Sequence, residues 1–350
     1  MTVSRAGRPR VRSSTGATIS GALAAFGIDP SSIDVVAPLV SGTGRTRGFR
    51  VRVDDRDWAL KRYTSLSAVE GLRRSHPLEL RLAEAGFPVA PLCIAGSGET
   101  VVRNGPAWYS LHRWVEGQQV SIGGRDALIR ARPHLVRELA VMIATLHMVG
   151  SQDLDEGGEG DPDRLLRVPR ANVRRIHGSR RRLVSRWQVL RLKPRKSDFD
   201  RWALRVLPEV AARAETLAKN SIAHRVPRSE TGLIHNDVNW ENLILDEGFH
   251  VRALLDFDNV VRAPWALEVG AGAVVLVGAD PHTVDQFVSG YEATTGAAFD
   301  RDLVRLGMEL KCVRSIITSV LAYLDGGTDT RLLAPWCHHL HESLQLVQQE

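Results

Sequence analysis

Acidic and amide side chains recur at short, regular spacing in GLIHNDVNWENLILDEGFHVRALLDFDN, residues 232–259. His235 and Asp237 follow one apolar run, Asn242 comes five residues after Asp237, and Asp256 follows a second apolar run. Short strands on both sides would close a loop in which these side chains point into one cavity. A carboxylate can orient and deprotonate an attacking hydroxyl, and carboxylate and amide oxygens are hard ligands for Mg²⁺ that bridges phosphates. The pattern therefore indicates phosphoryl transfer from a nucleotide.

The order H-x-D-x-x-x-x-N followed by D-F-D matches the catalytic loop of kinases and the place of their metal-binding D-F-G. Over about residues 35–325 the chain resembles the aminoglycoside phosphotransferase family of protein-kinase-like small-molecule kinases. The resemblance implies that Asp237 is the catalytic base and that His235 supports the loop. It also implies that Asn242 and Asp256 hold Mg²⁺, together with Asp258, which could equally cap a turn.

The same resemblance implies where a nucleotide, ATP or GTP, is bound. Lys61 in a predicted strand would contact the α- and β-phosphates. Gly42 and Gly44 would belong to a phosphate-covering loop, because glycine lets backbone N–H groups approach phosphate closely; a plain turn before the first hairpin strand is the alternative. An acid on the following helix is expected to hold the lysine, and Glu79 is favoured over Glu70.

Residues 109–117, with His112 and Trp114, resemble the segment that links the two lobes, where backbone groups hydrogen-bond a purine edge. An ordinary strand and turn would look the same. His147 matches a frequent helix element of the family, but no chemistry is assigned to it. After the metal motif, Leu267-Glu268-Val269-Gly270 departs from the family's usual D-L-A, and Glu268 could do the same capping and charge work.

Elements that would position these residues are visible in the apolar patterning. Residues 48–53 and 57–63 alternate around a polar tip and predict a β-hairpin. Helical spacing over residues 67–85, with Gly86 after it, predicts a helix, and a strand pair is expected at 89–95 and 101–103. Residues 133–148 predict the clearest amphipathic helix, and residues 260–345 are expected to be largely helical.

We therefore predict an α+β, two-lobed protein-kinase-like fold with a small β-rich N-lobe, a larger mainly helical C-lobe, and the nucleotide between them. The expected division is a flexible basic arm at 1–18, the N-lobe at 19–111 and the C-lobe at 112–350. Within the C-lobe, residues 153–163 are an acidic, glycine-rich linker, and residues 164–196 are an arginine-rich helical insert. The insert is interpreted as a solvated surface or as a surface that attracts an anionic substrate.

Composition places the chain among globular proteins. It has 350 residues, 43% hydrophobic, and no apolar run long enough to span a membrane; AVVLVGA at 273–279 is expected to be a buried helix. The first twenty residues lack an apolar signal segment, which favours a cytoplasmic protein. Cys93, Cys312 and Cys337 are too few and too scattered for a disulfide framework. The net charge of +6 favours anionic ligands only weakly.

Other interpretations stay open. A two-metal phosphoesterase would use the same acids as metal ligands but would leave Lys61 without a role, and a pseudokinase or nucleic-acid module would use the arginine-rich segment. Cys337 and His341 share a helical face and could contribute to a zinc site.

For the acceptor, we expect a small molecule with a hydroxyl group, without nucleic-acid or membrane partners. A neutral or anionic antibiotic is favoured, and a homoserine- or choline-kinase-like metabolite is the alternative. The oligomeric state and the choice between ATP and GTP stay open.

Overall fold

The structure, a computed structural model, describes residues 13–40, 46–151, 186–220, 230–326 and 330–349. Gly42, Gly44, the acidic linker and most of the arginine-rich insert lie outside the described residues. The chain divides into two compact units. The first comprises Met1–Ser41, Arg45–His76 and Ala90–Trp114, and the second comprises Gly42–Gly44, Pro77–Val89 and Val115–Glu350.

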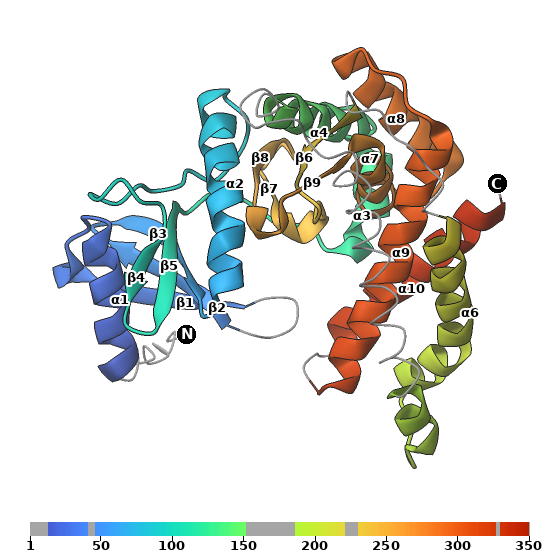
Figure 1. The fold of residues 1–350 in the computed structure, drawn as a ribbon, viewed down its shortest axis with the longest axis horizontal. Helices are drawn as coiled ribbons and strands as arrows, with labels where there is room; N and C mark the ends of the chain where they lie inside the picture. Colours follow the sequence, from blue (N-terminus) through green and yellow to red (C-terminus); the bar gives the residue numbers. More distant parts are fainter. Residues whose placement is uncertain (1–12, 41–45, 152–185, 221–229, 327–329, 350) are drawn as a thin grey trace, which may run out of the picture. The chain divides into compact units, whose positions relative to one another are not determined.

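A five-stranded antiparallel sheet forms the body of the first unit (Figure 1). Its strand order is β1-β2-β3-β5-β4. The strands are β1 (Asp34–Val40), β2 (Thr46–Val53), β3 (Arg56–Tyr63), β4 (Val102–Asn104) and β5 (Ala107–Arg113). The predicted hairpin is confirmed as β2–β3, and its tip residues Asp54 and Asp55 have φ of 48° and 59°. Two successive positive φ values give the turn that matches the twist of paired strands.

The helix α1 (Ser13–Ala25) packs against this sheet, and the short 3₁₀ turn η1 (Pro30–Ser32) leads from it to β1. Ile19 and Leu23 are buried in one apolar cluster with Leu60 and Leu111 from the sheet. The prediction of a flexible arm over residues 1–18 is therefore wrong for residues 13–18, because these residues form the first turns of α1.

The helix α2 (Leu66–Glu84) confirms the predicted helix, and Gly86, with φ of 73°, follows its end. The predicted strand at 89–95 is wrong. Only two isolated bridges occur there, Val89 with Leu254 and Leu92 with His112. Pro91 lies in this segment and Pro88 directly precedes it, and a proline has no N–H to donate to a strand ladder.

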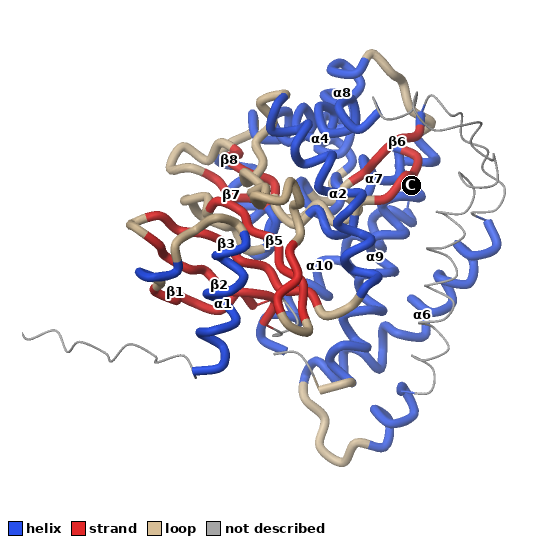
Figure 2. The backbone as a smooth tube through the Cα atoms, turned by 60° about the vertical axis from the view of Figure 1, so that its left-hand side comes forward, coloured by secondary structure: helices blue, strands red, loops and turns tan. Residues whose placement is uncertain are grey.

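Helices dominate the second unit, as predicted, and two short β-ribbons lie in the same unit (Figure 2). One ribbon pairs β6 with β9, and the other pairs β7 with β8. The turn η5 follows the loop after β6, and the turn η6 follows β8; these two regions carry the predicted site. The bounds are η2 (Ile122–Gly124), α3 (Arg125–Ala131), α4 (His134–Ser151), α6 (Asp198–Asn220), β6 (Thr231–Ile234), η5 (Trp240–Asn242), β7 (Leu243–Leu245), β8 (Val251–Leu254), η6 (Phe257–Asn259), β9 (Val261–Pro264), α7 (Trp265–Gly272), η7 (Ala273–Val277), α8 (Pro281–Thr295), α9 (Arg301–Leu324) and α10 (Thr330–Gln349).

The long helix α9 packs against α6, α7 and α10, and α4 packs against α8 and β6. The α7–α9 contact depends on two glycines. A Cβ atom at Gly270 would overlap the carbonyl oxygen of Val304, and one at Gly307 would overlap that of Leu267. The two helix backbones therefore touch, and this close approach brings the next turn of α9 beside β6 and the loop that follows it.

The apolar run at 273–279 forms a buried π-helical turn, η7, which confirms a buried helical segment. None of the helices in the described part of the chain combines the length and the apolar composition that a membrane span requires.

Candidate active site

His235 ties the loop after β6 to the end of β8. Its side chain is fully buried. Its Nδ1 accepts a hydrogen bond from the backbone N–H of Asp237 at 3.3 Å, and its Nε2 donates to the carbonyl oxygen of Leu255 at 2.9 Å. These two partners assign the neutral tautomer with the proton on Nε2. His235 therefore holds the residue before Asp256 next to Asp237.

Asp237 is half-exposed, with 34% of its side chain accessible. Its Oδ1 accepts from Asn239 Nδ2 at 3.3 Å and lies 3.4 Å from the ammonium of Lys311. Within the described residues, no group donates a hydrogen bond to Oδ2. One carboxylate oxygen is thus held from two sides, and the other is available to an incoming hydroxyl.

Asn242 is fixed through both its side chain and its backbone. Its Nδ2 donates to the carbonyl oxygen of Asp237 at 2.9 Å, and its own carbonyl accepts from the N–H of Leu255 at 2.8 Å. Asn239 caps the η5 turn by accepting from the N–H of Asn242 at 3.0 Å. Because Nδ2 is engaged, the amide oxygen Oδ1 is the atom of Asn242 that can serve as a ligand.

Asp256 directly follows Leu255 and has a left-handed backbone, with φ of 64° and ψ of 58°. A non-glycine residue in this region is strained, and such residues gather at functional sites. Asp258 lies two residues further, in η6, and both carboxylates are half-buried. An amide oxygen and two carboxylates are the hard oxygen donors that Mg²⁺ prefers, so the residues fit this ion.

Glu268 anchors the loop from α7; the sequence predicted capping and charge work for this residue but did not reveal its partners in the loop. Its carboxylate is 2% exposed and accepts hydrogen bonds from the backbone N–H of His235, at 2.9 Å, and of Asn236. His147 Nε2 lies 2.8 Å from the same carboxylate. Burial alone would raise the pKa of Glu268, but the hydrogen bond and charge of His147, the imidazole of His235 and the N–H of Asn236 outweigh it and lower the pKa.

His147, to which the sequence assigned no chemistry, supports Glu268 in this anchor. Its Nδ1 lies 2.8 Å from the hydroxyl of Tyr291, and its ring stacks on Trp265 with centroids 5.7 Å apart. The imidazole is fully buried. A carboxylate, an imidazole and a phenol from α7, α4 and α8 thus form one buried network beneath the loop.

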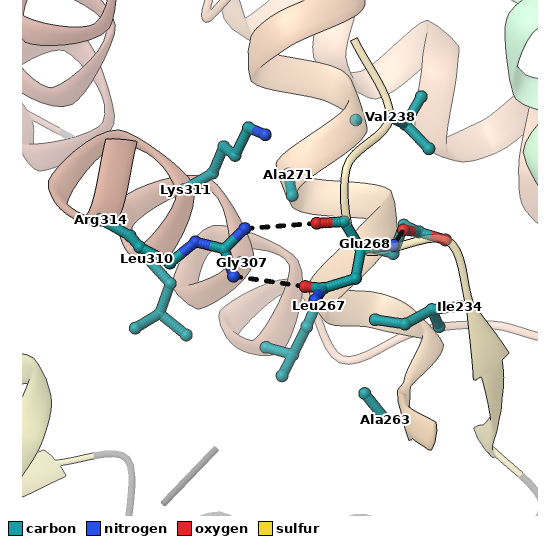
Figure 3. Close-up of a pocket in the computed structure, with 12 residues that line it drawn as sticks. Ile234, Val238, Ala263, Leu267, Glu268, Ala271, Gly307, Leu310, Lys311 and Arg314 are labelled. Atoms are coloured by element: carbon teal, nitrogen blue, oxygen red, sulfur yellow. Dashed lines mark hydrogen bonds between the residues drawn. The ribbon is translucent and has the colours of Figure 1, made fainter. Parts of the chain in front are cut away.

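Lys311 and Arg314 reach the loop from α9 and were also missed. The guanidinium of Arg314 donates to the carbonyl oxygen of Asn236 at 3.2 Å and to its side-chain oxygen at 3.3 Å, drawn as dashed lines in Figure 3. Both cations line a cavity of about 50 Å³ whose other walls are mostly apolar. Burial lowers the pKa of Lys311, although the Asp237 carboxylate opposes this shift.

Three of the predicted nucleotide-binding residues, Lys61, His112 and Trp114, belong to the first unit, whereas Glu79 belongs to the second. Lys61 in β3 pairs with Ser110 of β5, and His112 is buried on β5. The N–H of Trp114 donates to the carbonyl of Asp57 at 3.0 Å. On α2, Glu79 is buried and Glu70 is exposed. Which of these acids serves Lys61 stays a prediction.

The zinc hypothesis for the C-terminal helix finds no support in the described residues. Cys337 is fully buried, and burial raises the pKa of its thiol to about 12, which disfavours the thiolate that binds zinc. His341 instead lies 3.4 Å from Glu209. The only described group of three metal-ligating side chains within ligand distance does not include either residue.

A sheet-based first unit, a mainly helical second unit and the H-x-D-x-x-x-x-N loop define a protein-kinase-like phosphotransferase. A sequence model of the phosphotransferase enzyme family matches residues 36–306, and the chain belongs to this family. It is a small-molecule phosphotransferase. No curated protein matches the chain.

Solved structures with low sequence identity share the fold. A spectinomycin phosphotransferase, APH(9)-Ia, solved with ADP and spectinomycin, aligns with a TM-score of 0.64 at 13% identity over 95% of this chain and 98% of its own. The choline kinase LicA from Streptococcus pneumoniae aligns with a TM-score of 0.59 at 12% identity, over 97% and 100%. An aminoglycoside phosphotransferase from Alicyclobacillus acidocaldarius aligns with a TM-score of 0.52 at 21% identity, over 90% and 93%.

Proposed function

We propose that this protein transfers the γ-phosphate of a nucleoside triphosphate, ATP or GTP, to a hydroxyl group of a small molecule in a Mg²⁺-dependent reaction. One observation carries the proposal. The hydrogen bonds of His235 and Asn242 join the loop that holds Asp237 to Leu255, the residue before Asp256. The proposed base and two of the proposed metal ligands, Asn242 and Asp256, are thereby held near one another by hydrogen bonds of the protein itself.

In this proposal Asp237 is the base. Its carboxylate orients the acceptor hydroxyl and takes its proton as the oxygen attacks the γ-phosphate. Asn242, Asp256 and Asp258 would hold Mg²⁺, which, when bound, neutralises charge on the phosphates. His235 keeps the loop in register with β8. Positioning and electrostatics do most of the work in phosphoryl transfer, and a rigid, hydrogen-bonded loop suits this demand.

The nucleotide is proposed to bind through the residues that the kinase-like motifs identify. Lys61 would contact its phosphates and Glu79 would steady that lysine, since Glu79 is buried and Glu70 is exposed. Gly42 and Gly44 would cover the phosphates, and the segment with His112 and Trp114 would face the base. The ADP complex of the spectinomycin phosphotransferase, which shares the fold, supports nucleotide use.

For the acceptor, we propose a neutral or anionic antibiotic, which would make the protein a resistance or self-protection kinase. Lys311 and Arg314 line the cavity beside the catalytic loop, and two cations there repel a cationic acceptor. This argues against a polycationic aminoglycoside and against choline, the substrate named for one structural neighbour. A neutral or zwitterionic metabolite such as homoserine is the alternative acceptor.

A diphosphate-release screen tests the proposal. ATP and GTP are each offered with antibiotics of several classes, sugars, choline and homoserine, and product is confirmed by mass. We expect Mg²⁺-dependent release that needs a neutral or anionic hydroxyl compound. A bacterial susceptibility test with the active antibiotic then separates resistance from metabolism.

Two variants check the assigned roles. Asp237→Ala should lower turnover at least about 100-fold while the nucleotide still binds, whereas Asp256→Ala should weaken Mg²⁺-dependent nucleotide binding. Asp285→Ala, an exposed aspartate on α8, is the control and should keep both properties. Near-normal turnover of Asp237→Ala would remove Asp237 from its role as base.

A further inference from the structure

Lys311 is a buried cation beside the proposed base. Its side chain is 6% exposed, and its ammonium lies 3.4 Å from Oδ1 of Asp237. It stands one turn after Gly307, where the backbones of α7 and α9 touch. Burying an ammonium is costly unless a partner compensates it, and an apolar side chain of the same size would avoid this cost. Stability alone therefore does not account for a lysine at this position.

The two oxygens of the Asp237 carboxylate have different surroundings. Oδ1 is approached by two donors from separate elements, Asn239 of the loop at 3.3 Å and Lys311 of α9 at 3.4 Å. Oδ2 receives no hydrogen bond from any residue that the structure describes. Two contacts from different directions restrict the rotation of a carboxylate more than one contact does. The carboxylate plane is consequently set by a helix as well as by its own loop.

We propose that Lys311 is a positioning residue that, together with Asn239, holds Oδ1 of Asp237 so that Oδ2 is the oxygen that takes the proton of the acceptor. This inference rests on the proposed function. The acceptor O–H bond breaks and its proton moves to Oδ2, while the acceptor oxygen forms a bond to the γ-phosphorus. The bond from that phosphorus to the β–γ bridging oxygen breaks, and the nucleoside diphosphate leaves with the electron pair. The proton then passes from Oδ2 to solvent.

The chemistry of the step explains why positioning matters here. The transition state of phosphoryl transfer is loose, so little basicity is needed from the carboxylate, but the attacking oxygen must be in line with the leaving group. A displacement of about 1 Å can cost on the order of 100-fold in rate. A carboxylate that is free to rotate would present either oxygen, and the hydroxyl would be aligned for only part of the time.

The test compares Lys311→Met, which removes the charge at similar size, with Lys311→Arg, which keeps it. Turnover is measured with the acceptor from the release screen, or with water as acceptor if none is found. Lys311→Met should lower kcat about 10- to 100-fold and leave KM for the nucleotide within about twofold. Lys311→Arg should recover part of the loss. Arg305→Met, on the same helix but without a contact to the loop, should behave as wild type.

A double variant separates positioning from other roles. If Lys311 acts through Asp237, Lys311→Met should cause no further loss of turnover in an Asp237→Asn background. The melting temperature of the single variant Lys311→Met should match or exceed that of wild type, because a buried charge is removed. A further loss in that background, or a fall in melting temperature that accounts for the lost turnover, would overturn the inference. If Lys311→Met turns over like wild type while Asp237→Ala is inactive, the role of Lys311 is rejected and the proposed function stands. Active Asp237→Ala would reject the proposed function.

Discussion

His147 Nε2 lies 2.8 Å from Glu268 Oε2, and both side chains are buried beneath the catalytic loop. This pair links two helices that are far apart in the sequence, α4 and α7. The same carboxylate accepts hydrogen bonds from the backbone N–H groups of His235 and Asn236, so one buried acid holds the loop in place. The geometry of the site therefore depends on a residue that is not expected to touch either substrate.

Glu268→Gln tests this anchor. The amide keeps the shape but replaces one acceptor oxygen with a donor, which would face a donor of the loop or of His147. We expect a loss of about 3 kcal/mol in the free energy of unfolding, as for a broken buried pair, and a fall in turnover of at least about 10-fold. Denaturant unfolding and diphosphate release measure the two effects. Unchanged values for both would show that the loop holds its shape without Glu268.

The α7–α9 crossing offers a matched pair of glycine variants. Gly270→Ala would force the new methyl group into the carbonyl of Val304, whereas the nearest atom to a Cβ at Gly272 is 3.7 Å away, in Phe287. Overpacking of this kind costs about 1–3 kcal/mol. Gly270→Ala should therefore lower the melting temperature by several degrees, and Gly272→Ala should not. Equal melting temperatures for both variants would contradict the close backbone contact.

A buried ion pair joins α6 to α9. Glu309 is 4% exposed and is bound by the guanidinium of Arg213, with Nε 3.1 Å from Oε2. Arg213→Met would leave the carboxylate buried without its counter-charge, and we expect a loss of about 3 kcal/mol in the free energy of unfolding. The double variant Arg213→Met/Glu309→Leu should recover most of this loss. Equal instability of the single and double variants would show that packing, not charge, is responsible.

His339 gives a pH dependence with a defined sign. Burial and the guanidinium of Arg125, whose Nη1 lies 2.7 Å from Nε2, lower the pKa of His339 from 6.5 to about 4. Between these values the unfolded chain binds a proton that the folded protein does not bind. The contribution of His339 to stability is therefore present above pH 6.5 and is lost as the pH falls toward 4.

The measurement is denaturant unfolding of wild type and of His339→Asn at pH 7 and pH 5. Wild type should lose about 1 kcal/mol more than the variant over this interval, after allowance for partial solvent screening. The pKa of Glu268 is lowered from 4.5, so that group titrates below the interval and does not confuse the comparison. Parallel behaviour of the two proteins would reject the assignment.

The loop that carries the candidate site could be predicted from the sequence, because its polar residues are neighbours along the chain. Asp237 and Asn242 belong to one motif, and apolar runs on both sides predicted the strands that hold them. The hairpin and the two long helices followed from alternation and helical spacing in the same way. By contrast, the strand expected at 89–95 was wrong, because Pro91 within this segment removes a donor from the ladder.

The contacts that the sequence did not reveal join residues far apart along the chain. Glu268 meets His235 across 33 residues and His147 across 121, and Lys311 meets Asp237 across 74. Local patterning places each of them on a buried helix face but cannot say which helices will cross. A buried acid and a buried lysine on otherwise apolar faces were the available signals. Both are rare enough in a core to call for a partner.

The helix α9 starts inside the segment that matches the family, residues 36–306, and continues beyond it to Leu324. Lys311 stands in the continuation, so one contact of the proposed base comes from outside the segment that the family model matches. Remodelling this helix to admit a different acceptor would therefore also retune the proton-accepting group. Acceptor selectivity and turnover would then change together, so a variant with a new acceptor would need a second substitution to restore turnover.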